Sequence, residues 1–437
     1  MKKFLSGLGL FAISIAWLVV WTMLPWFAVL ALAIVLALWL AFTRRGRQTL
    51  SVTNVGISTM RQRIGSSAVI VVGIAGVVGV LVALLAMGEG LSATLRQTGS
   101  DDTAIVLRGG SQAESNSVLT RDNIAIIEEA KGIASDAQGK PIASAELVVV
   151  ANVPKKDDPA TDSNVEIRGV GDEAWQLRPN VKIVAGRRFR PGLRELDVGQ
   201  AAQRQFAGLD VGNHLKLAGQ EWTVVGVFTS GDSNESELWG DVHSVAAAYR
   251  RGSSAESVTV RLSSPSAFDR FKATLMSDPT LKVDVTTTRE YFSKQSEGVS
   301  KVIRVVGITI GVIMAIGAVF GALNTMYAAV ATRAREIATL RAIGFRGVPV
   351  VISVLLETML LALFGGIIGA AIVWLIFNGY TASTLGANFS QVVFQFKVSP
   401  ALLWSGLKWA LAIGFIGGLF PAVRAARLPV TTALREL

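Results

Sequence analysis

The chain has 437 residues, of which 51% are hydrophobic and only 17% are charged. Soluble domains usually carry about 25% charged residues, so the low charge and the long apolar runs place this chain in a membrane. It has no cysteine, which excludes disulfides and thiol chemistry, and its two histidines, His214 and His243, lie far apart, which argues against a metal site. The net charge of +10 does not indicate nucleic-acid binding, because much of the basic excess lies beside apolar segments, where it sets topology and contacts anionic membrane lipids.

Residues 1–43 predict an extra transmembrane hairpin at the N-terminus. They are almost wholly apolar and too long for one helix, and Pro25, flanked by tryptophans, offers a turn at the interface. We expect its arms at about Phe4–Met23 and Trp26–Phe42, with both basic ends in the cytoplasm. A signal peptide is the alternative, since the lysine-rich start fits one, but the apolar run continues past any cleavage point.

A cytoplasmic interfacial helix is predicted at residues 44–65, which hold five arginines and no acidic residue. A transmembrane helix follows at residues 66–90 and is expected to end at its Gly-Glu-Gly sequence. Within it, Gly73, Gly76 and Gly79 permit close helix packing in lipid. The alternative is a plain membrane anchor whose composition happens to be rich in small residues.

Residues 91–300 are polar, with alternating apolar segments and turn clusters that predict an α+β domain. Because this segment lies between spans of opposite direction, it must be extracytoplasmic. Residues 186–248 look like a compact subdomain inserted between its halves. The segment Arg289–Val302 predicts a helix that returns the chain to the membrane.

Residues 301–437 predict three further transmembrane helices, and the second of them carries a single charge, Glu357. The last contains Lys408, for which snorkelling toward the outer interface is favoured over a functional intramembrane charge. The three spans lie at about 305–331, 348–380 and 401–423. Together with the hairpin and residues 66–90, they predict six spans, both chain ends in the cytoplasm and one large outer domain.

The loop at residues 332–347, TRAREIATLRAIGFRG, carries four arginines against one glutamate, so the positive-inside rule places it in the cytoplasm. Ile337, Leu340 and Ile343 fall on one face at helical spacing, and Gly344 is a stop signal. Such a short amphipathic helix either lies in the lipid interface or docks into a groove of another protein.

Apart from Glu89 at the very end of the 66–90 helix, Glu357 is the only carboxylate within the predicted spans, and we expect Arg341 or Asn324 to satisfy it. A proton-coupled transporter normally needs more intramembrane ionisable groups. The phosphate-binding sequence GxxxxGK[ST] does not occur, so the chain does not bind and split ATP by that route, and no catalytic constellation is credible. These features indicate a non-catalytic membrane subunit that another protein moves.

Three groups of residues carry a family resemblance. In and beside the basic loop they are Asn324, Thr332, Arg333, Arg335, Glu336, Ile337, Leu340, Arg341, Gly344, Phe345 and Glu357. In the tail they are Gly418, Pro421, Ala422, Arg424, Ala425, Ala426, Arg427, Pro429, Ala433, Leu434 and Arg435. In the outer domain they are residues 186–189, 209–217 and 222–228. Over about residues 48–437 the sequence resembles the FtsX-like permeases, and within them the MacB type of ABC transporter.

The resemblance implies an α-helical membrane protein of the type VII-like ABC class, with a large α+β periplasmic core domain, in the bacterial inner membrane. MacB carries an ATPase domain ahead of its first span, which we do not find in this sequence. A separate ABC ATPase subunit is therefore expected, together with a homodimer of the permease. ATP and Mg would bind that ATPase, and this chain would hold no cofactor. The family core has four spans, so the hairpin is an addition.

The resemblance also implies mechanotransmission, in which closure of the ATPases is passed through the 332–347 helix to the outer domains without a substrate channel. The alternative is that this helix only lies among lipid headgroups. The apolar face seated in the ATPase groove would comprise Ile337, Leu340, Ile343 and Phe345. Its polar rim would comprise Arg335, Glu336 and Arg341.

Two functions are compatible with this assignment. One is a permease that exports or extracts an amphiphile, peptide or lipoprotein from the periplasm, with a periplasmic adaptor and an outer-membrane channel as further candidate partners. The other is a signal relay that controls a cell-wall hydrolase or senses an antibiotic. The full-length outer domain favours transport. A soluble enzyme on a membrane anchor is the weakest interpretation, because the sequence offers no catalytic constellation.

Overall fold

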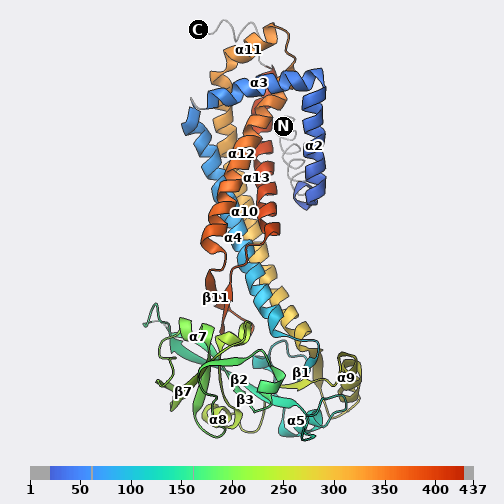
Figure 1. Ribbon diagram of the computed structural model, residues 1–437, viewed down its shortest axis with the longest axis vertical. Helices are drawn as coiled ribbons and strands as arrows, with labels where there is room; N and C mark the ends of the chain where they lie inside the picture. The colour runs from blue at the N-terminus through green and yellow to red at the C-terminus, as the bar shows by residue number, and fades with distance from the viewer. Residues whose placement is uncertain (1–19, 61–62, 161, 428–437) are drawn as a thin grey trace, which may run out of the picture. The chain divides into compact units, whose positions relative to one another are not determined.

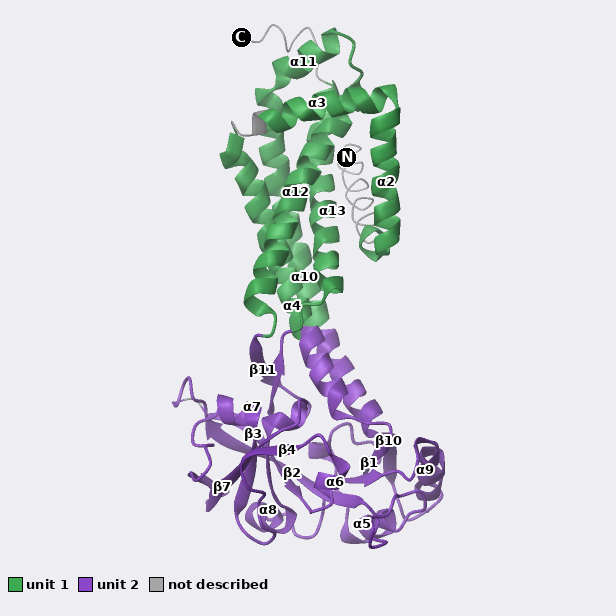
Figure 2. Cartoon of the chain, viewed as in Figure 1, with its two compact units in different colours: residues 1–87, 303–379, 397–437 green, residues 88–302, 380–396 purple. Residues whose placement is uncertain are grey.

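The computed structural model describes residues 20–60, 63–160 and 162–427 (Figure 1). They fall into two compact units, shown in different colours in Figure 2. The helical unit comprises the described residues of 1–87, 303–379 and 397–437, and the strand-rich unit comprises residues 88–302 and 380–396. Most of the first arm predicted for the N-terminal hairpin lies outside the described residues.

The helical unit is built from long apolar helices. Its elements are α2 (Trp26–Phe42), α3 (Arg44–Met60), α4 (Ile64–Thr98), α10 (Thr288–Thr332), α11 (Ala334–Ala342), α12 (Gly347–Phe377) and α13 (Pro400–Arg427), of which α4 and α10 also contribute residues to the strand-rich unit. Among the described residues, α4, α10, α12 and α13 are long and apolar enough to cross a membrane, and they coincide with four spans expected from the sequence. Helices α2 and α3 meet at 95° and together form a fifth, bent candidate.

Helix α4 is longer than its sequence suggests, because it continues to Thr98 instead of ending at its Gly-Glu-Gly sequence. Leu91 and Leu95, one turn apart, are 1% and 5% exposed, so the following turns bury an apolar edge that extends the helix. Gly90 serves packing here, since a Cβ at this position would clash with the carbonyl oxygen of Gln395.

Close helix packing in the helical unit depends on glycines of α12 and α13. A Cβ on Gly369 would clash with the backbone of Ala75 in α4, and one on Gly414 would clash with Ala362. By contrast, Gly73 and Gly76 would meet no atom within 4 Å among the described residues. Their small size therefore does not serve packing between the described helices.

The strand-rich unit is organised around one ten-stranded sheet with the order β10-β1-β9-β2-β3-β8-β5-β7-β4, and with β6 paired to β7. The strands are β1 (Thr103–Arg108), β2 (Ala143–Pro154), β3 (Asp162–Val170), β4 (Lys182–Gly186), β5 (Glu195–Gly199), β6 (His214–Leu217), β7 (Gln220–Thr229), β8 (Glu237–Asp241), β9 (Ser257–Arg261) and β10 (Val283–Thr287). The accompanying helices are α5 (Arg121–Glu128), α6 (Ala174–Leu177), α7 (Gln200–Gln205), α8 (Val242–Tyr249) and α9 (Phe268–Met276). The pairs β3–β8 and β5–β7 are parallel, and the other pairs are antiparallel.

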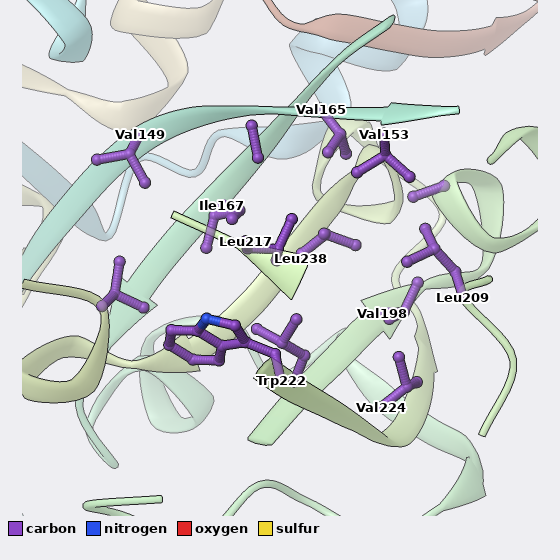
Figure 3. Close-up of a cluster of buried hydrophobic side chains, with 14 of the residues drawn as sticks. Val149, Val153, Val165, Ile167, Val198, Leu209, Leu217, Trp222, Val224 and Leu238 are labelled. Carbon is purple, nitrogen blue, oxygen red and sulfur yellow. The ribbon is translucent and has the colours of Figure 1, made fainter. Parts of the chain in front are cut away.

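Two large hydrophobic cores flank this sheet. One lies under α5 and α9 and includes Phe271. The other includes Val149 of β2, Ile167 of β3 and Trp222 of β7 (Figure 3). Strand β2 contributes to both cores, and β3 pairs directly with β8, so residues 186–248 do not form a separate inserted subdomain. The prediction of that boundary is wrong, because sheet pairing between segments distant in sequence is not visible in local composition.

The segment between α12 and α13 folds as a β-hairpin of β11 (Thr381–Leu385) and β12 (Gln391–Gln395). It belongs to the strand-rich unit although it lies near the end of the chain.

Lys408 lies in α13 and is only 8% exposed, so other parts of the chain cover its side chain, and its snorkelling toward an interface stays a prediction. Its Nζ atom donates hydrogen bonds to the carbonyl oxygens of Thr22 and Leu24, at 2.6 and 3.1 Å. The indole N–H of Trp21 donates to the Lys408 carbonyl at 2.8 Å. Pro25 has no N–H and ends the preceding helix, which leaves carbonyl groups that need a donor. Lys408 therefore fixes the turn before α2 onto α13.

Replacing Lys408 with methionine is expected to loosen this turn, because hydrogen bonds to a charged donor are worth about 1.5–3 kcal/mol each and Met offers none. We expect faster hydrogen exchange of the amides of residues 21–30 in the full-length protein. Lys397→Met is the matched control, since Lys397 is exposed. Unchanged exchange in Lys408→Met would show that other contacts hold the turn.

Candidate functional site

The charged site of the helical unit lies where α10 ends and α11 begins. The break falls at Arg333, whose side chain is directed to two carboxylates. Its Nη1 atom lies 3.0 Å from Oε2 of Glu357 in α12, and its Nε atom lies 3.1 Å from Oε2 of Glu336 in α11. A single guanidinium group thus joins the ends of three consecutive helices.

A second arginine completes the site from the segment between α3 and α4. Arg63 approaches Oε1 of Glu357 at 3.5 Å and donates to the carbonyl oxygen of Ala329 in α10 at 3.4 Å. Helix α3 passes close by at Gly56, where a Cβ would lie 3.1 Å from Oε2 of Glu357 and 3.3 Å from Nη1 of Arg333. The small residue at position 56 therefore lets α3 lie against the ion pair.

Glu357 is only 5% exposed, and the Arg333 side chain is 11% exposed. A carboxylate buried to this degree is costly unless it is paired, and both of its oxygens face guanidinium groups. We call Arg63, Arg333 and Glu357 the elbow ion-pair cluster. Because its members come from the α3–α4 segment, the α10–α11 break and α12, the cluster holds the break between α10 and α11 against α12.

The partners expected for Glu357 from the sequence are wrong. Within the described part of the chain, its ion-pair partners are Arg333 and Arg63, whereas Arg341 lies farther along α11 and Asn324 is exposed on α10. Arg333 is one of the residues that carry the family resemblance. Its ion pair with Glu357 was not predicted, because Arg333 lies just before α11 and the sequence argument considered the residues of that helix. The spacing of Arg333 and Glu357, on either side of a turn between spans, was the available signal.

Helix α11 occupies the middle of the 332–347 segment and ends at Ala342, two residues before Gly344, whose φ of +107° places it in the left-handed region. Ile337 is 4% exposed, so its side chain packs within the helical unit and is not available to a partner. Leu340, Arg341 and Phe345 are half-buried. The residues of this segment that are exposed include Arg335, Glu336 and Ile343, and Ile343 is 69% exposed.

The strand-rich unit contains a second charged cluster, which the sequence did not reveal. Arg168 of β3, a buried residue, contacts four buried glutamates that come from four different segments. The distances from its guanidinium nitrogens to the carboxylate oxygens are 2.8 Å for Glu114, 2.9 Å for Glu146, 2.9 Å for Glu166 and 2.8 Å for Glu237. Arg178 adds a second cation, 2.6 Å from Glu146. We call these six residues the Arg168 cluster.

The carboxyl groups of this cluster differ in their proton affinity. Burial would raise the pKa of Glu146, but the charges of Arg178 and Arg168 hold it below its ordinary value. Burial and the negative charge of Glu237 raise the pKa of Glu166 to about 7, despite the nearby Arg168. Among the described residues, no group of His, Cys, Asp or Glu could hold a metal ion, and the cluster is balanced by arginine instead.

The long apolar helices and the mixed α/β unit define a multispanning membrane protein with an extracytoplasmic-type domain. The profile of the MacB-like periplasmic core domain matches residues 67–277, and that of the FtsX-like permease C-terminal family matches residues 308–430. The chain belongs to the FtsX-like, MacB-type permeases, which are components of ABC transporters.

Relatives of known sequence agree with this assignment. The chain is 27% identical over 402 residues to the macrolide export ATP-binding/permease protein MacB of Burkholderia cenocepacia, covering 84% of this chain and 54% of that protein. It is 37% identical over 116 residues to the MacB of Pectobacterium atrosepticum, covering 26% of this chain and 17% of that protein. The chain thus spans at most about half the length of these relatives.

The periplasmic region of MacB from Actinobacillus actinomycetemcomitans is a solved structure to which the chain is similar. It is 16% identical, with a TM-score of 0.35, and covers 45% of this chain and 92% of that region.

Proposed function

We propose that this chain is the permease subunit of an ABC transporter of the bacterial inner membrane, and that it acts by mechanotransmission. ATP hydrolysis in a separate ABC ATPase subunit would drive export or extraction of an amphiphile, peptide or lipoprotein from the periplasm. The chain itself would hold no ATP, and a homodimer would present two α11 helices to two ATPases. The observation that carries the proposal is the elbow ion-pair cluster, which holds the break between α10 and α11 against α12.

The path of the motion is supported by chain continuity. Helix α10 runs without a break over 45 residues, from Thr288, directly after β10, to Thr332, directly before the elbow. A continuous helix resists axial compression. A displacement applied to α11, at the C-terminal end of α10, is therefore transmitted along α10 to its N-terminal end. Arg333 and Glu357 keep the α10–α11 angle from absorbing that displacement.

The surface offered to the ATPase differs from the face predicted from the sequence. Ile337 is covered by the chain itself, so the apolar anchor of the exposed surface is Ile343, with Leu340 and Phe345 at its half-buried edge. Arg335 and Glu336 supply charges beside it. An exposed apolar side chain with a charged rim is typical of a helix docked in a groove.

Replacing Ile343 with glutamate is expected to weaken ATPase binding at least tenfold, because a charge placed in an apolar groove must be desolvated without a partner. Leu340→Glu should have a similar effect but also perturbs a half-buried contact. The measurement is co-purification of the ATPase with the permease and the permease-dependent stimulation of its activity.

Ile57→Glu in α3 is the matched control, since Ile57 is 40% exposed and lies outside the 332–347 segment. If Ile343→Glu retained full binding and transport, α11 would not be the docking element. Stimulated ATPase activity without movement of any substrate in reconstituted vesicles would indicate a signal relay instead of a transporter.

A further inference from the structure

The β11–β12 hairpin is the third place, after α4 and α10, where the strand-rich unit is continuous in sequence with the membrane helices. It follows α12 and precedes α13 directly. Its attachment to the rest of the strand-rich unit combines the buried apolar side chains of Val393 and Phe394 with several polar contacts. Asn388 and Ser390, in the turn between the two strands, are 9% and 2% exposed.

These turn residues converge on one carboxyl group of the Arg168 cluster. The side-chain amide of Asn388 donates to Oε2 of Glu166 at 3.1 Å, and the hydroxyl of Ser390 donates to the same oxygen at 2.9 Å. The backbone N–H of Val393 in β12 donates to Oγ of Ser236 at 2.9 Å. The other oxygen of Glu166 accepts from Arg168.

The surroundings of Glu166 carry more negative than positive charge. Arg168 faces it from the same strand, whereas Glu237 faces it from β8 and Glu114 from the segment before α5. Glu146 and Arg178 pair with each other beside Arg168, and the phenol of Tyr291 from α10 accepts a hydrogen bond from the backbone N–H of Glu114. Four glutamates against two arginines leave the cluster two negative charges in excess when all six groups are ionised.

We propose that Glu166 is the positioning residue that fastens the hairpin between α12 and α13 to the strand-rich unit, and that proton uptake by its carboxyl group tightens this attachment. A neutral carboxyl still accepts from Asn388, and its O–H can donate to the Ser390 hydroxyl. Neutralisation also removes one of the excess charges that the hairpin buries. If the chain works by mechanotransmission, on which this part rests, the hairpin gives α12 and α13 their own connection to the strand-rich unit.

The direction of the pH effect follows from linkage. With the hairpin attached, burial and the negative charges of Glu237 and Glu114 raise the pKa of Glu166 to about 7, although the hydrogen bond from Asn388 lowers it. Detachment removes the part of this burial that the hairpin supplies, so the pKa moves toward the ordinary glutamate value of 4.5. The attached state therefore binds more protons between these values, so attachment is favoured at low pH and weakens as the pH rises through 7. Because one proton is involved per attachment site, attachment changes by at most about tenfold per pH unit, and the change levels off above the pKa of the attached state.

A single cysteine tests this, because the natural sequence has none. Val393→Cys places the thiol at a position that is 8% exposed in the attached hairpin, and it retains the backbone N–H that donates to Ser236. Thr381→Cys on the same hairpin is exposed and serves as the reference. The measurement is the maleimide labelling rate of full-length protein in lipid nanodiscs, as the ratio of the two cysteines, which cancels the pH dependence of the thiol.

We expect this ratio to rise about tenfold between about pH 6 and pH 8 with Glu166 present, and to stay flat in Glu166→Gln. Ser390→Ala should raise the ratio at every pH, because it removes one donor. A flat ratio with Glu166 present, or an equal rise in Glu166→Gln, would overturn the proposal. Labelling needs neither an ATPase nor a substrate, so it tests the fastening role by itself. If the labelling ratios are as expected but transport is unaffected in Glu166→Gln, Glu166 fastens the hairpin without a part in mechanotransmission.

Discussion

Glu357→Gln is expected to uncouple the ATPase from the permease and to destabilise the helical unit. Glutamine keeps the size of the side chain but leaves Arg333 and Arg63 without the carboxylate that both of them approach. Removing one partner of a buried ion pair typically costs about 3–5 kcal/mol, because the remaining charge is left uncompensated. The measurements are thermal unfolding of the purified chain and permease-dependent ATPase stimulation after reconstitution.

Two further variants separate coupling from stability. Glu290→Gln is the control, since Glu290 also pairs with a cation of α10, Lys294, but its side chain is 48% exposed, and exposed pairs contribute little. The double variant Glu357→Gln with Arg333→Gln should recover part of the stability, because it removes a cation together with its partner. It should not recover the coupling, because the α10–α11 angle remains unfixed. Full coupling in this double variant would exclude the elbow ion-pair cluster as a transmission element.

Arg168→Met is expected to have the largest effect on the strand-rich unit. It leaves the glutamates at positions 114, 166 and 237 without their guanidinium partner in a buried site. By the same argument, the cost is at least about 3–5 kcal/mol near neutral pH. The measurement is hydrogen exchange of the backbone amides of β3 and β8 in the full-length protein, because β3 carries Glu166 and Arg168 and β8 carries Glu237.

The effect of Arg168→Met should depend on pH in a definite direction. The pKa of Glu166 is already raised to about 7, and loss of the Arg168 charge, which lowers it, raises it further. The stability that Glu166 contributes is then present at low pH and is lost as the pH rises through this raised value, so the variant should be closer to the wild type at about pH 5 than at about pH 8. Arg187→Met serves as control, since Arg187 pairs with Glu195 at the surface, and little change is expected. An equal loss of protection at both pH values would show that Arg168 acts by packing alone.

The length of the uncharged apolar segments allowed four spans to be located from the sequence alone. Helices α4, α10, α12 and α13 each contain the apolar run predicted for them, because a bilayer imposes a minimum length that can be read without knowledge of packing. The short helix α11 and its end just before Gly344 were also predictable, since helical periodicity and a glycine stop are local signals. The family resemblance likewise rested on residues close together in the chain.

Pairing between distant segments could not be predicted in the same way. The partner of Glu357 is Arg333 instead of Arg341, Lys408 binds the turn before α2, and Glu166 receives a hairpin more than 200 residues away. Buried charged groups take whichever partner the fold brings within hydrogen-bond distance, and that distance is set by packing that local sequence does not encode. The sequence by itself therefore determined which segments lie in the membrane and which family the chain resembles, whereas only the tertiary structure decided which charges hold those segments together.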